Sequence, residues 1–195
     1  MRFAKGYARD LTAAIQSGNE SLREKVVDEL QILAGEKSFA MKRVSGEKIL
    51  DDAREKIYAE IGSRPIVLKI KAHPALPAVV ADSKFVAYAI NAFAHRTVAM
   101  LGPLPGKITL EAHPKTLTRE AGQLFDPPLQ PGRGVSYLFT DTTTPLSVED
   151  RARAFHPYYS THPSGRGMSL ALAASILRAH GGAGSVPTWR RSPAG

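Results

Sequence analysis

Residues 155–182 read FHPYYSTHPSGRGMSLALAASILRAHGG, and this stretch carries the most specific information on the fold. An aromatic group around a proline leads into a short loop of glycine, serine and proline. An apolar segment follows, which we predict to be a helix over Ser164–His180 that ends at Gly181 and Gly182, as helices commonly end at glycine. Glycines directly before a helix let a ligand approach the backbone closely.

The composition is that of an ordinary folded chain. It has 195 residues, of which 43% are hydrophobic, enough for the core of one domain with a short extension. The sequence contains no cysteine, which excludes disulfides and thiolate metal sites. It has no run of about 18 apolar residues, and Met1–Arg9 is not typical of a secretory leader. We expect a cytoplasmic location, with membrane association only through segments upstream of this sequence.

The net charge is +8, which permits binding to nucleic acid, to a nucleotide phosphate or to an acidic partner. The lysines and arginines are scattered, and Arg190–Arg191 is the one dense cluster. No predicted helix shows a basic face with interleaved aromatic residues, so we do not expect nucleic-acid binding.

The first part of the chain predicts helices. Residues 7–34 read as two helical pieces separated at 17–19. The second piece has a plausible capping box, Ser21 with Glu24. Its apolar residues recur at helical spacing and need a partner, either the first piece or a second chain. They are Leu22, Val26, Val27, Leu30 and Leu33.

The rest of the chain alternates between helices and strands. Ser45 is the expected N-cap and Gly62 the end of a helix whose apolar stripe is Ile49, Ala53, Ile57 and Ile61. The further predicted elements are a strand over 66–73, a connection over 73–82, a helix over 83–100, a strand over 107–113, a loop over 114–134, a strand over 135–141 inside a sheet, and a short helix over 146–155. Strands with helices packed on one face make an α+β fold of two layers.

Five stretches carry a more specific pattern. They are LPAVVADSKF (76–85), INAFAHRTVAM (90–100), DTTTPLSVED (141–150), FHPYY (155–159) and GRGMSL (165–170). In this order they resemble the phrases P-x-V-x-A-D, L-N-L-L-E-N-A-x-x-A-M, D-x-G-x-G, F-x-P-F-Y and G-x-G-x-G-L of the catalytic, ATP-binding domain of bacterial sensor histidine kinases. That domain belongs to the wider ATPase group that includes Hsp90 and gyrase.

The resemblance covers roughly residues 44–182. It implies a two-layer α/β sandwich of the histidine kinase and Hsp90 type over 44–195. Residues 1–43 would form a preceding helical segment, because ELQILA (29–34) resembles the end of the family's dimerisation module.

The resemblance also implies the residues of a nucleotide site. Asp141 would accept a hydrogen bond from the adenine amino group, and the loop 160–167 would be a lid over the nucleotide. The aromatic residues Phe155, Tyr158 and Tyr159 would pack the hinge of this lid, and core packing is the plainer reading of the same residues. The full nucleotide-binding set is Asp141, Thr143, Gly165, Arg166, Gly167, Ser169 and Leu170. Arg166 would meet the γ-phosphate or stand in solvent.

The family's magnesium ligand is replaced here by His95. Magnesium prefers oxygen ligands, whereas imidazole suits other metals better. Asn91, one helical turn earlier, could supply the oxygen instead, or a protonated His95 could contact phosphate directly. We therefore assign catalytic roles to His95 and Asn91 and a metal-ligating role to Asn91. The alternative is that His95 is a tolerated helix residue in an inactive site.

The implied function is transfer of the γ-phosphoryl group of ATP, with Mg²⁺, to a histidine and then to a response regulator receiver domain. The N-terminal helices would form a homodimer. The phosphate-accepting histidine is not visible, since no histidine precedes His73 and Arg9 stands in the nearest phrase. The alternative is a nucleotide-free pseudokinase that acts as a scaffold or phosphotransfer adaptor. It is motivated by four departures from the family phrases, which are His95, Thr143, Pro145 and Ser169.

Overall fold

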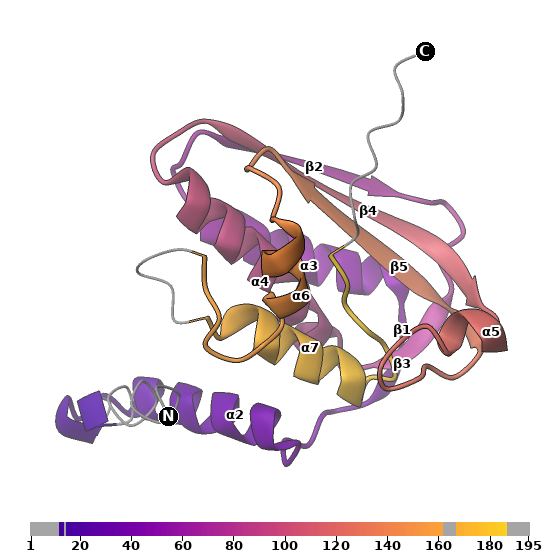
Figure 1. The fold of residues 1–195 in the computed structure, drawn as a ribbon, viewed down its shortest axis with the longest axis horizontal. Coiled ribbons are helices and arrows are strands. Elements are labelled where there is room, and N and C mark those ends of the chain that lie inside the picture. The colour runs from indigo at the N-terminus through magenta and orange to yellow at the C-terminus, as the bar shows by residue number, and fades with distance from the viewer. Residues whose placement is uncertain (1–11, 14, 162–166, 187–195) are drawn as a thin grey trace.

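The computed structural model describes residues 12–13, 15–161 and 167–186. Helices cover one face of a small sheet, with α3 and α4 against the strands, α7 beyond α4, and α2 outermost (Figure 1). The elements are α2 (Glu20–Ala34), β1 (Lys42–Ser45), α3 (Gly46–Ile61), β2 (Ile66–Ala72), β3 (Ala78–Ala81), α4 (Ser83–Leu101), β4 (Gly106–Leu117), α5 (Arg119–Gly122), β5 (Gly132–Asp141), α6 (Val148–Arg153) and α7 (Ser169–Ala179). The predicted α+β fold is confirmed.

The main sheet has the order β2-β4-β5. β2 and β4 are parallel, and β4 and β5 are antiparallel, with Ile108 opposite Asp141. The prediction that 135–141 lies inside the sheet was wrong, because β4 is the central strand and β5 is an edge in the described part of the chain. The reason is visible in the burial, since Ile108 and Leu110 of β4 are fully buried while β5 has no fully buried residue.

The core lies between this sheet and helices α3 and α4. The predicted stripe of α3 is confirmed, since Ile49, Ala53, Ile57 and Ile61 are all buried. The caps of α3 are also those predicted. The Ser45 side chain accepts a hydrogen bond from the Lys48 amide, and Gly62 ends the helix with a φ of 57°.

A second, two-stranded sheet was not predicted. β1 and β3 pair antiparallel, with Arg43 opposite Val80. The sequence reading treated 73–82 as a connection, because four-residue strands between prolines give almost no local signal. This ladder brings the N-termini of α3 and α4 to the same end of the molecule.

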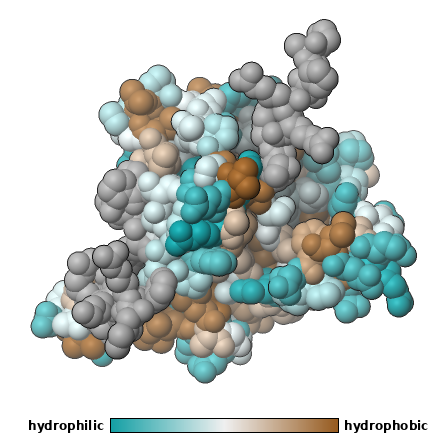
Figure 2. Space-filling view, viewed as in Figure 1, coloured by the Kyte–Doolittle hydropathy of each residue, from teal (hydrophilic) through white to brown (hydrophobic). Residues whose placement is uncertain are grey.

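The prediction for α2 was correct in extent and wrong in its cap and buried face. Asn19, not Ser21, is the N-cap, and its Oδ1 accepts from the Leu22 amide over 3.1 Å. Val26 and Ile32 are buried, and the helix packs against α7. Three residues of the predicted apolar stripe stay exposed, namely Leu22, Val27 and Leu30. Figure 2 shows hydrophobic side chains on this surface along α2.

The C-terminal end of α7 is tied to the start of α4. Gly181 has a φ of 69°, and the Gly182 amide donates to the Leu177 carbonyl over 2.8 Å, which confirms the predicted glycine cap. The Asp82 amide donates to His180 Nε2 over 3.1 Å, and His180 Nδ1 lies 2.7 Å from the Ile176 carbonyl oxygen. Among the described helices, none is both long and apolar enough to cross a membrane.

Candidate functional site

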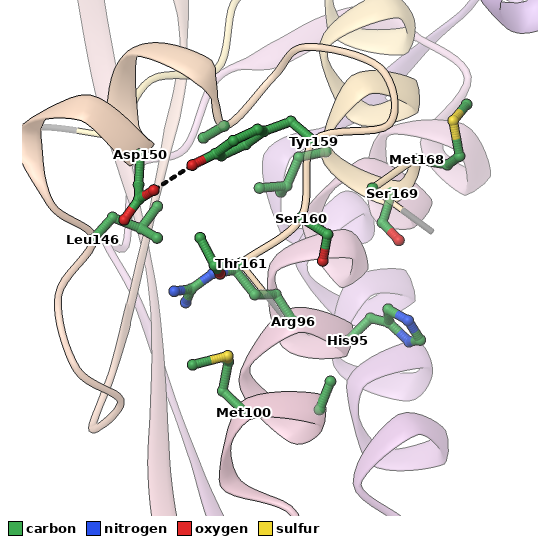
Figure 3. Close-up of a pocket in the computed structure, with 14 residues that line it drawn as sticks. His95, Arg96, Met100, Leu146, Asp150, Tyr159, Ser160, Thr161, Met168 and Ser169 are labelled. Carbon is green, nitrogen blue, oxygen red and sulfur yellow. Dashed lines mark hydrogen bonds between the residues drawn. The ribbon is translucent and has the colours of Figure 1, made fainter. Parts of the chain in front are cut away.

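A pocket opens between α4, α6 and the start of α7 (Figure 3). Its lining residues are His95, Arg96, Ala99, Met100, Leu146, Asp150, Ala154, Tyr159, Ser160, Thr161, Gly167, Met168, Ser169 and Leu170. The wall is therefore mixed, with apolar side chains beside hydroxyl, imidazole and guanidinium groups. Such a mixture suits a ligand that combines an apolar body with charged or polar groups.

The structure brings together some of the sequence-predicted site residues and not others. His95, Tyr159, Gly167, Ser169 and Leu170 line the pocket. Five others are absent from its lining, namely Asn91, Asp141, Thr143, Phe155 and Tyr158. Gly165 and Arg166 lie outside the described residues.

Asp141 ends β5 with its carboxylate held by the protein itself. The Thr97 hydroxyl donates to Oδ2, and Thr143 donates to Oδ1 through its amide (2.8 Å) and its hydroxyl (2.6 Å). Thr97 is fully buried on α4, so this network joins the strand end to the helix. A carboxylate offers about four acceptor positions, so one is left for a ligand donor.

Arg96 connects this network to the pocket. Its Nη1 lies 3.4 Å from the Thr143 hydroxyl oxygen, and its guanidinium lies in the pocket beside Thr161 (Figure 3). Sequence reasoning missed this residue. The signal was available, because the family phrase has alanine directly after its second asparagine and this chain has Arg96 there.

The N-terminus of α7 faces the pocket without a side-chain cap. The helix begins at Ser169, not at the predicted Ser164, and Met168 makes no side-chain cap hydrogen bond. The first turn of a helix has amide groups without intrahelical partners and a partial positive charge. Because Gly167, Ser169 and Leu170 all line the pocket, these amides are placed to bind an anionic group there.

The chain before α7 is held close to Gly167. Tyr158 has a positive φ of 65°, and its amide donates to the Gly167 carbonyl over 2.8 Å. The Tyr159 hydroxyl donates to Asp150, and the Arg153 guanidinium lies 4.4 Å from the centroid of the Tyr159 ring. Hydrogen bonds hold the pKa of the Asp150 carboxyl below its ordinary value. The bond from the Tyr159 hydroxyl contributes most, and the bond from the Ser147 hydroxyl comes second. Phe155 packs edge-on against Phe93 of α4.

His95 and Asn91 share a partner that the sequence did not suggest. Glu60 of α3 places Oε1 3.0 Å from His95 Nδ1, and its Oε2 accepts from Asn91 Nδ2 over 3.5 Å. Asn91 Oδ1 is buried with no hydrogen-bond partner among the described residues. No sequence signal could have found Glu60, because its role arises from the packing of α3 against α4.

The chain is similar to sensor histidine kinases in sequence and in fold. No family model matches the chain. Sensor histidine kinase ZraS of Escherichia coli K12 is 24% identical over 179 residues, 92% of this chain and 35% of that protein. ZraS of strain O157:H7 is 23% identical over the same share. The chain therefore spans about a third of the length of these curated relatives.

Solved structures of histidine kinases have the same fold. The mycobacterial sensor histidine kinase MprB matches with a TM-score of 0.54 and 15% identity over 73% of this chain and 81% of that one. The catalytic domain of histidine kinase ThkA, in a nucleotide-free form, matches with a TM-score of 0.55 and 14% identity over 73% of this chain and 82% of that one. Full-length ShkA in complex with AMPPNP matches with a TM-score of 0.58 and 21% identity over 84% of this chain and 34% of that one. The chain has the fold of a histidine kinase catalytic domain. Two-component signal transduction is the setting that these relatives' names indicate.

The histidine kinase fold provides a frame for testing whether Mg²⁺ fits this chain. Asn91 Oδ1, buried and without a partner, is an oxygen of the kind that Mg²⁺ prefers. His95 offers nitrogen at the position of the family's second asparagine. The fit is therefore partial, with one matching oxygen and one nitrogen that Mg²⁺ does not favour.

Proposed function

We propose that this chain is the ATP-binding catalytic region of a sensor histidine kinase. Residues 44–195 would bind ATP in the pocket between α4 and the start of α7. The γ-phosphoryl group would pass to a histidine of a helical dimerisation module and then to an aspartate of a response regulator receiver domain. The chain would work in the cytoplasm, alone or as the cytoplasmic part of a membrane-bound sensor.

The observation that carries the proposal is the uncapped N-terminus of α7, which faces the pocket behind Gly167. An anionic phosphate chain would be stabilised by the free amides of this turn and by the helix dipole. Asp141 retains one acceptor position for an amino group such as that of adenine. Thr97 and Thr143 fix the direction of that carboxylate.

The phosphoryl transfer itself breaks the bond between the γ-phosphorus and the β,γ-bridging oxygen and forms a phosphorus–nitrogen bond to the acceptor imidazole. ADP leaves with the bridging oxygen, and the imidazole loses its proton. A bound divalent cation would neutralise charge on the β- and γ-phosphates. The residues of this chain would contribute positioning and charge stabilisation, which is most of what proteins supply in this reaction.

Residues 1–43 are proposed as the end of the dimerisation module. Three apolar residues of α2 that stay exposed, Leu22, Val27 and Leu30, support this because the helix packs on α7 with other residues, Val26 and Ile32 among its buried ones. A homodimer through these helices would cover the exposed ones.

Calorimetry of ATP binding tests the proposal, with the wild type, Asp141→Asn and the control Asp51→Asn. Asp51 is a half-exposed carboxylate on α3 that pairs only with Arg54 in the salt bridges of the described chain. We expect ATP binding by the wild type and the control, and a loss of about tenfold or more in Asp141→Asn, since a partly buried charged acceptor is replaced by an amide. Absence of ATP and ADP binding by the wild type would overturn the proposal.

The second candidate is the nucleotide-free pseudokinase that serves as a scaffold or phosphotransfer adaptor. The observation in its favour is Arg96, whose long cationic side chain lines the pocket at a position where the family phrase has alanine. It predicts no heat with ATP, measurable affinity for a receiver domain, and ATP binding gained by Arg96→Ala. ATP-dependent phosphorylation of a supplied dimerisation module would exclude it.

A further inference from the structure

Two of the described residues that line the pocket carry a full charge at neutral pH, Arg96 and Asp150. The Asp150 carboxylate is occupied by the protein itself. Its Oδ1 accepts a hydrogen bond from the Tyr159 hydroxyl, and its Oδ2 accepts one from the Ser147 hydroxyl over 2.7 Å. The Arg153 guanidinium attracts the same carboxylate. The negative charge of the wall is therefore offset by neighbours other than Arg96.

Arg96 makes no ion pair in the described part of the chain, although its side chain is only partly exposed. Its Nη1 donates to the Thr143 hydroxyl oxygen over 3.4 Å. That hydroxyl gives its own proton to Asp141 Oδ1 over 2.6 Å, so its oxygen accepts from Arg96 and adds no net charge. This contact holds the guanidinium at the pocket wall and leaves most of its N–H donors to a ligand.

His95 is the other side chain of this wall that can become positively charged, and it has a carboxylate beside it. Glu60 Oε1 lies 3.0 Å from His95 Nδ1, so the charge of a protonated imidazole would be matched by Glu60. Arg96 and His95 also project in opposite directions (Figure 3). The cationic side chain that meets a ligand without a carboxylate of its own is therefore Arg96.

The donor set of the wall suits an anion better than Mg²⁺. Asn91 Oδ1 is buried, and Asn91 is absent from the lining of the pocket, so a ligand there does not meet this oxygen. His95 offers nitrogen, whereas Mg²⁺ prefers oxygen. No three His, Cys, Asp or Glu side chains of the described residues gather as a metal site. The guanidinium of Arg96 repels a cation and attracts an anion.

We propose that Arg96 binds the anionic group of the ligand in this pocket, and that the anion binds there without a divalent cation. A guanidinium can form two parallel hydrogen bonds to a phosphate group, and its charge strengthens both. The free amides at the start of α7 line the same pocket and add to the attraction. The identity of the anion as the phosphate chain of a nucleotide rests on the proposed function, whereas the role of Arg96 does not. Binding, and not the transfer step, is what Arg96 frees from the cation.

Calorimetry with ATP and with inorganic tripolyphosphate, each in EDTA and in Mg²⁺, tests this role. Both anions should bind in EDTA. Arg96→Ala should weaken the binding of both by about 10–100-fold, the usual cost of losing a charged hydrogen-bond partner. Arg96→Lys keeps the charge but not the planar fork, so its affinity should lie between those of the wild type and Arg96→Ala. Added salt should weaken binding more in the wild type than in Arg96→Ala, because salt screens the charge.

Arg133→Ala is the matched control. Arg133 is an exposed arginine of β5 that forms no ion pair within the described residues, and its removal should leave both affinities unchanged. An equal loss in the two variants would overturn the role of Arg96, as would unchanged or increased affinity in Arg96→Ala. Increased affinity for ATP is the result that the nucleotide-free pseudokinase predicts. Circular dichroism checks folding, and if Arg96→Ala does not fold, Arg96→Gln decides, because it keeps a polar side chain without the charge.

The two anions separate the role of Arg96 from the kinase proposal. ATP binding in EDTA that is weakened in Arg96→Ala supports both. Tripolyphosphate binding in EDTA that depends on Arg96, without any ATP binding, overturns the kinase proposal and leaves the role of Arg96 standing. ATP binding that Mg²⁺ strengthens by about tenfold or more, the worth of one charged hydrogen bond, does the reverse. Binding of neither anion overturns both.

Discussion

The backbone carbonyl of Gly167 accepts a hydrogen bond from the Tyr158 amide over 2.8 Å, which closes the chain on itself directly before α7. Both residues have a positive φ, 68° at Gly167 and 65° at Tyr158. The close approach depends on glycine, because a Cβ at position 167 would lie 2.4 Å from the Tyr158 carbonyl carbon. The atoms that this Cβ would meet belong to the backbone of Tyr158 and Tyr159, which cannot rotate away as a flexible side chain can.

Gly167→Ala should therefore destabilise the protein by about 1–3 kcal/mol, the usual cost of strained backbone. Urea denaturation measures this, and Gly134→Ala is the control, because a Cβ at Gly134 meets nothing within 4 Å. If the two variants unfold at the same urea concentration, the close approach at Gly167 is not a constraint. The proposed phosphate site also predicts weaker ATP binding in Gly167→Ala only.

Thr97→Val should show how much the hydrogen bonds to Asp141 contribute to the stability of the folded protein. The substitution keeps the shape of the side chain and removes the hydroxyl that donates to Asp141. Leaving a partly buried charged acceptor with fewer partners should cost about 1–3 kcal/mol of unfolding free energy. Thr116→Val, at an exposed position of β4, serves as the control and should change stability little. Equal stabilities of the two variants would show that the Thr97 hydroxyl adds nothing.

The Tyr159–Asp150 contact should show a defined pH dependence. The pKa of Asp150 is lower in the folded protein than its ordinary value, chiefly through the hydrogen bond from Tyr159. A group with a depressed pKa contributes stability above its unfolded pKa, and this contribution is lost as the pH falls through the folded pKa. The Tm difference between wild type and Tyr159→Phe should thus be constant near neutrality and shrink below about pH 4. A difference that does not change with pH would contradict this.

Ile57→Ala tests the core between α3 and the sheet. Ile57 is 0% exposed, and its truncation should cost about 2–5 kcal/mol through lost burial and the cavity left behind. The neighbouring Tyr58 is 55% exposed, so Tyr58→Ala should change the unfolding free energy by about 0.5 kcal/mol or less. Denaturant unfolding compares the two, and similar losses would place the core elsewhere.

The sequence predicted well what depends on local chemistry. Ser45 and Gly62 mark the two ends of α3, as predicted, because capping depends on a few adjacent residues. The buried stripe of α3 follows directly from helical periodicity. The pairing of β1 with β3 was missed, because four-residue strands are stabilised by partners about 35 residues away in the chain and not by their own composition.

In the candidate site, local reasoning found residues and missed relationships. His95 was identified from its position in a phrase, whereas Glu60 became relevant only when α3 packed beside α4. Arg96 was readable as a departure from alanine, but its contact with Thr143 joins segments 47 residues apart. The buried face of α2 also depends on a tertiary contact. In the packing with α7, Val26 and Ile32 become buried, whereas Leu22 and Leu30 stay exposed.

The bond between the Asp82 amide and His180 fixes the far end of α7 to the N-terminus of α4. Because a helix behaves as a stiff rod over 11 residues, anchoring its last turn also sets the aim of its first turn. The direction of the free amides at Ser169 is thus determined by the packed interior and not by the loop that precedes them. Loss of the His180 side chain should accordingly disturb the start of α7 as well as its end.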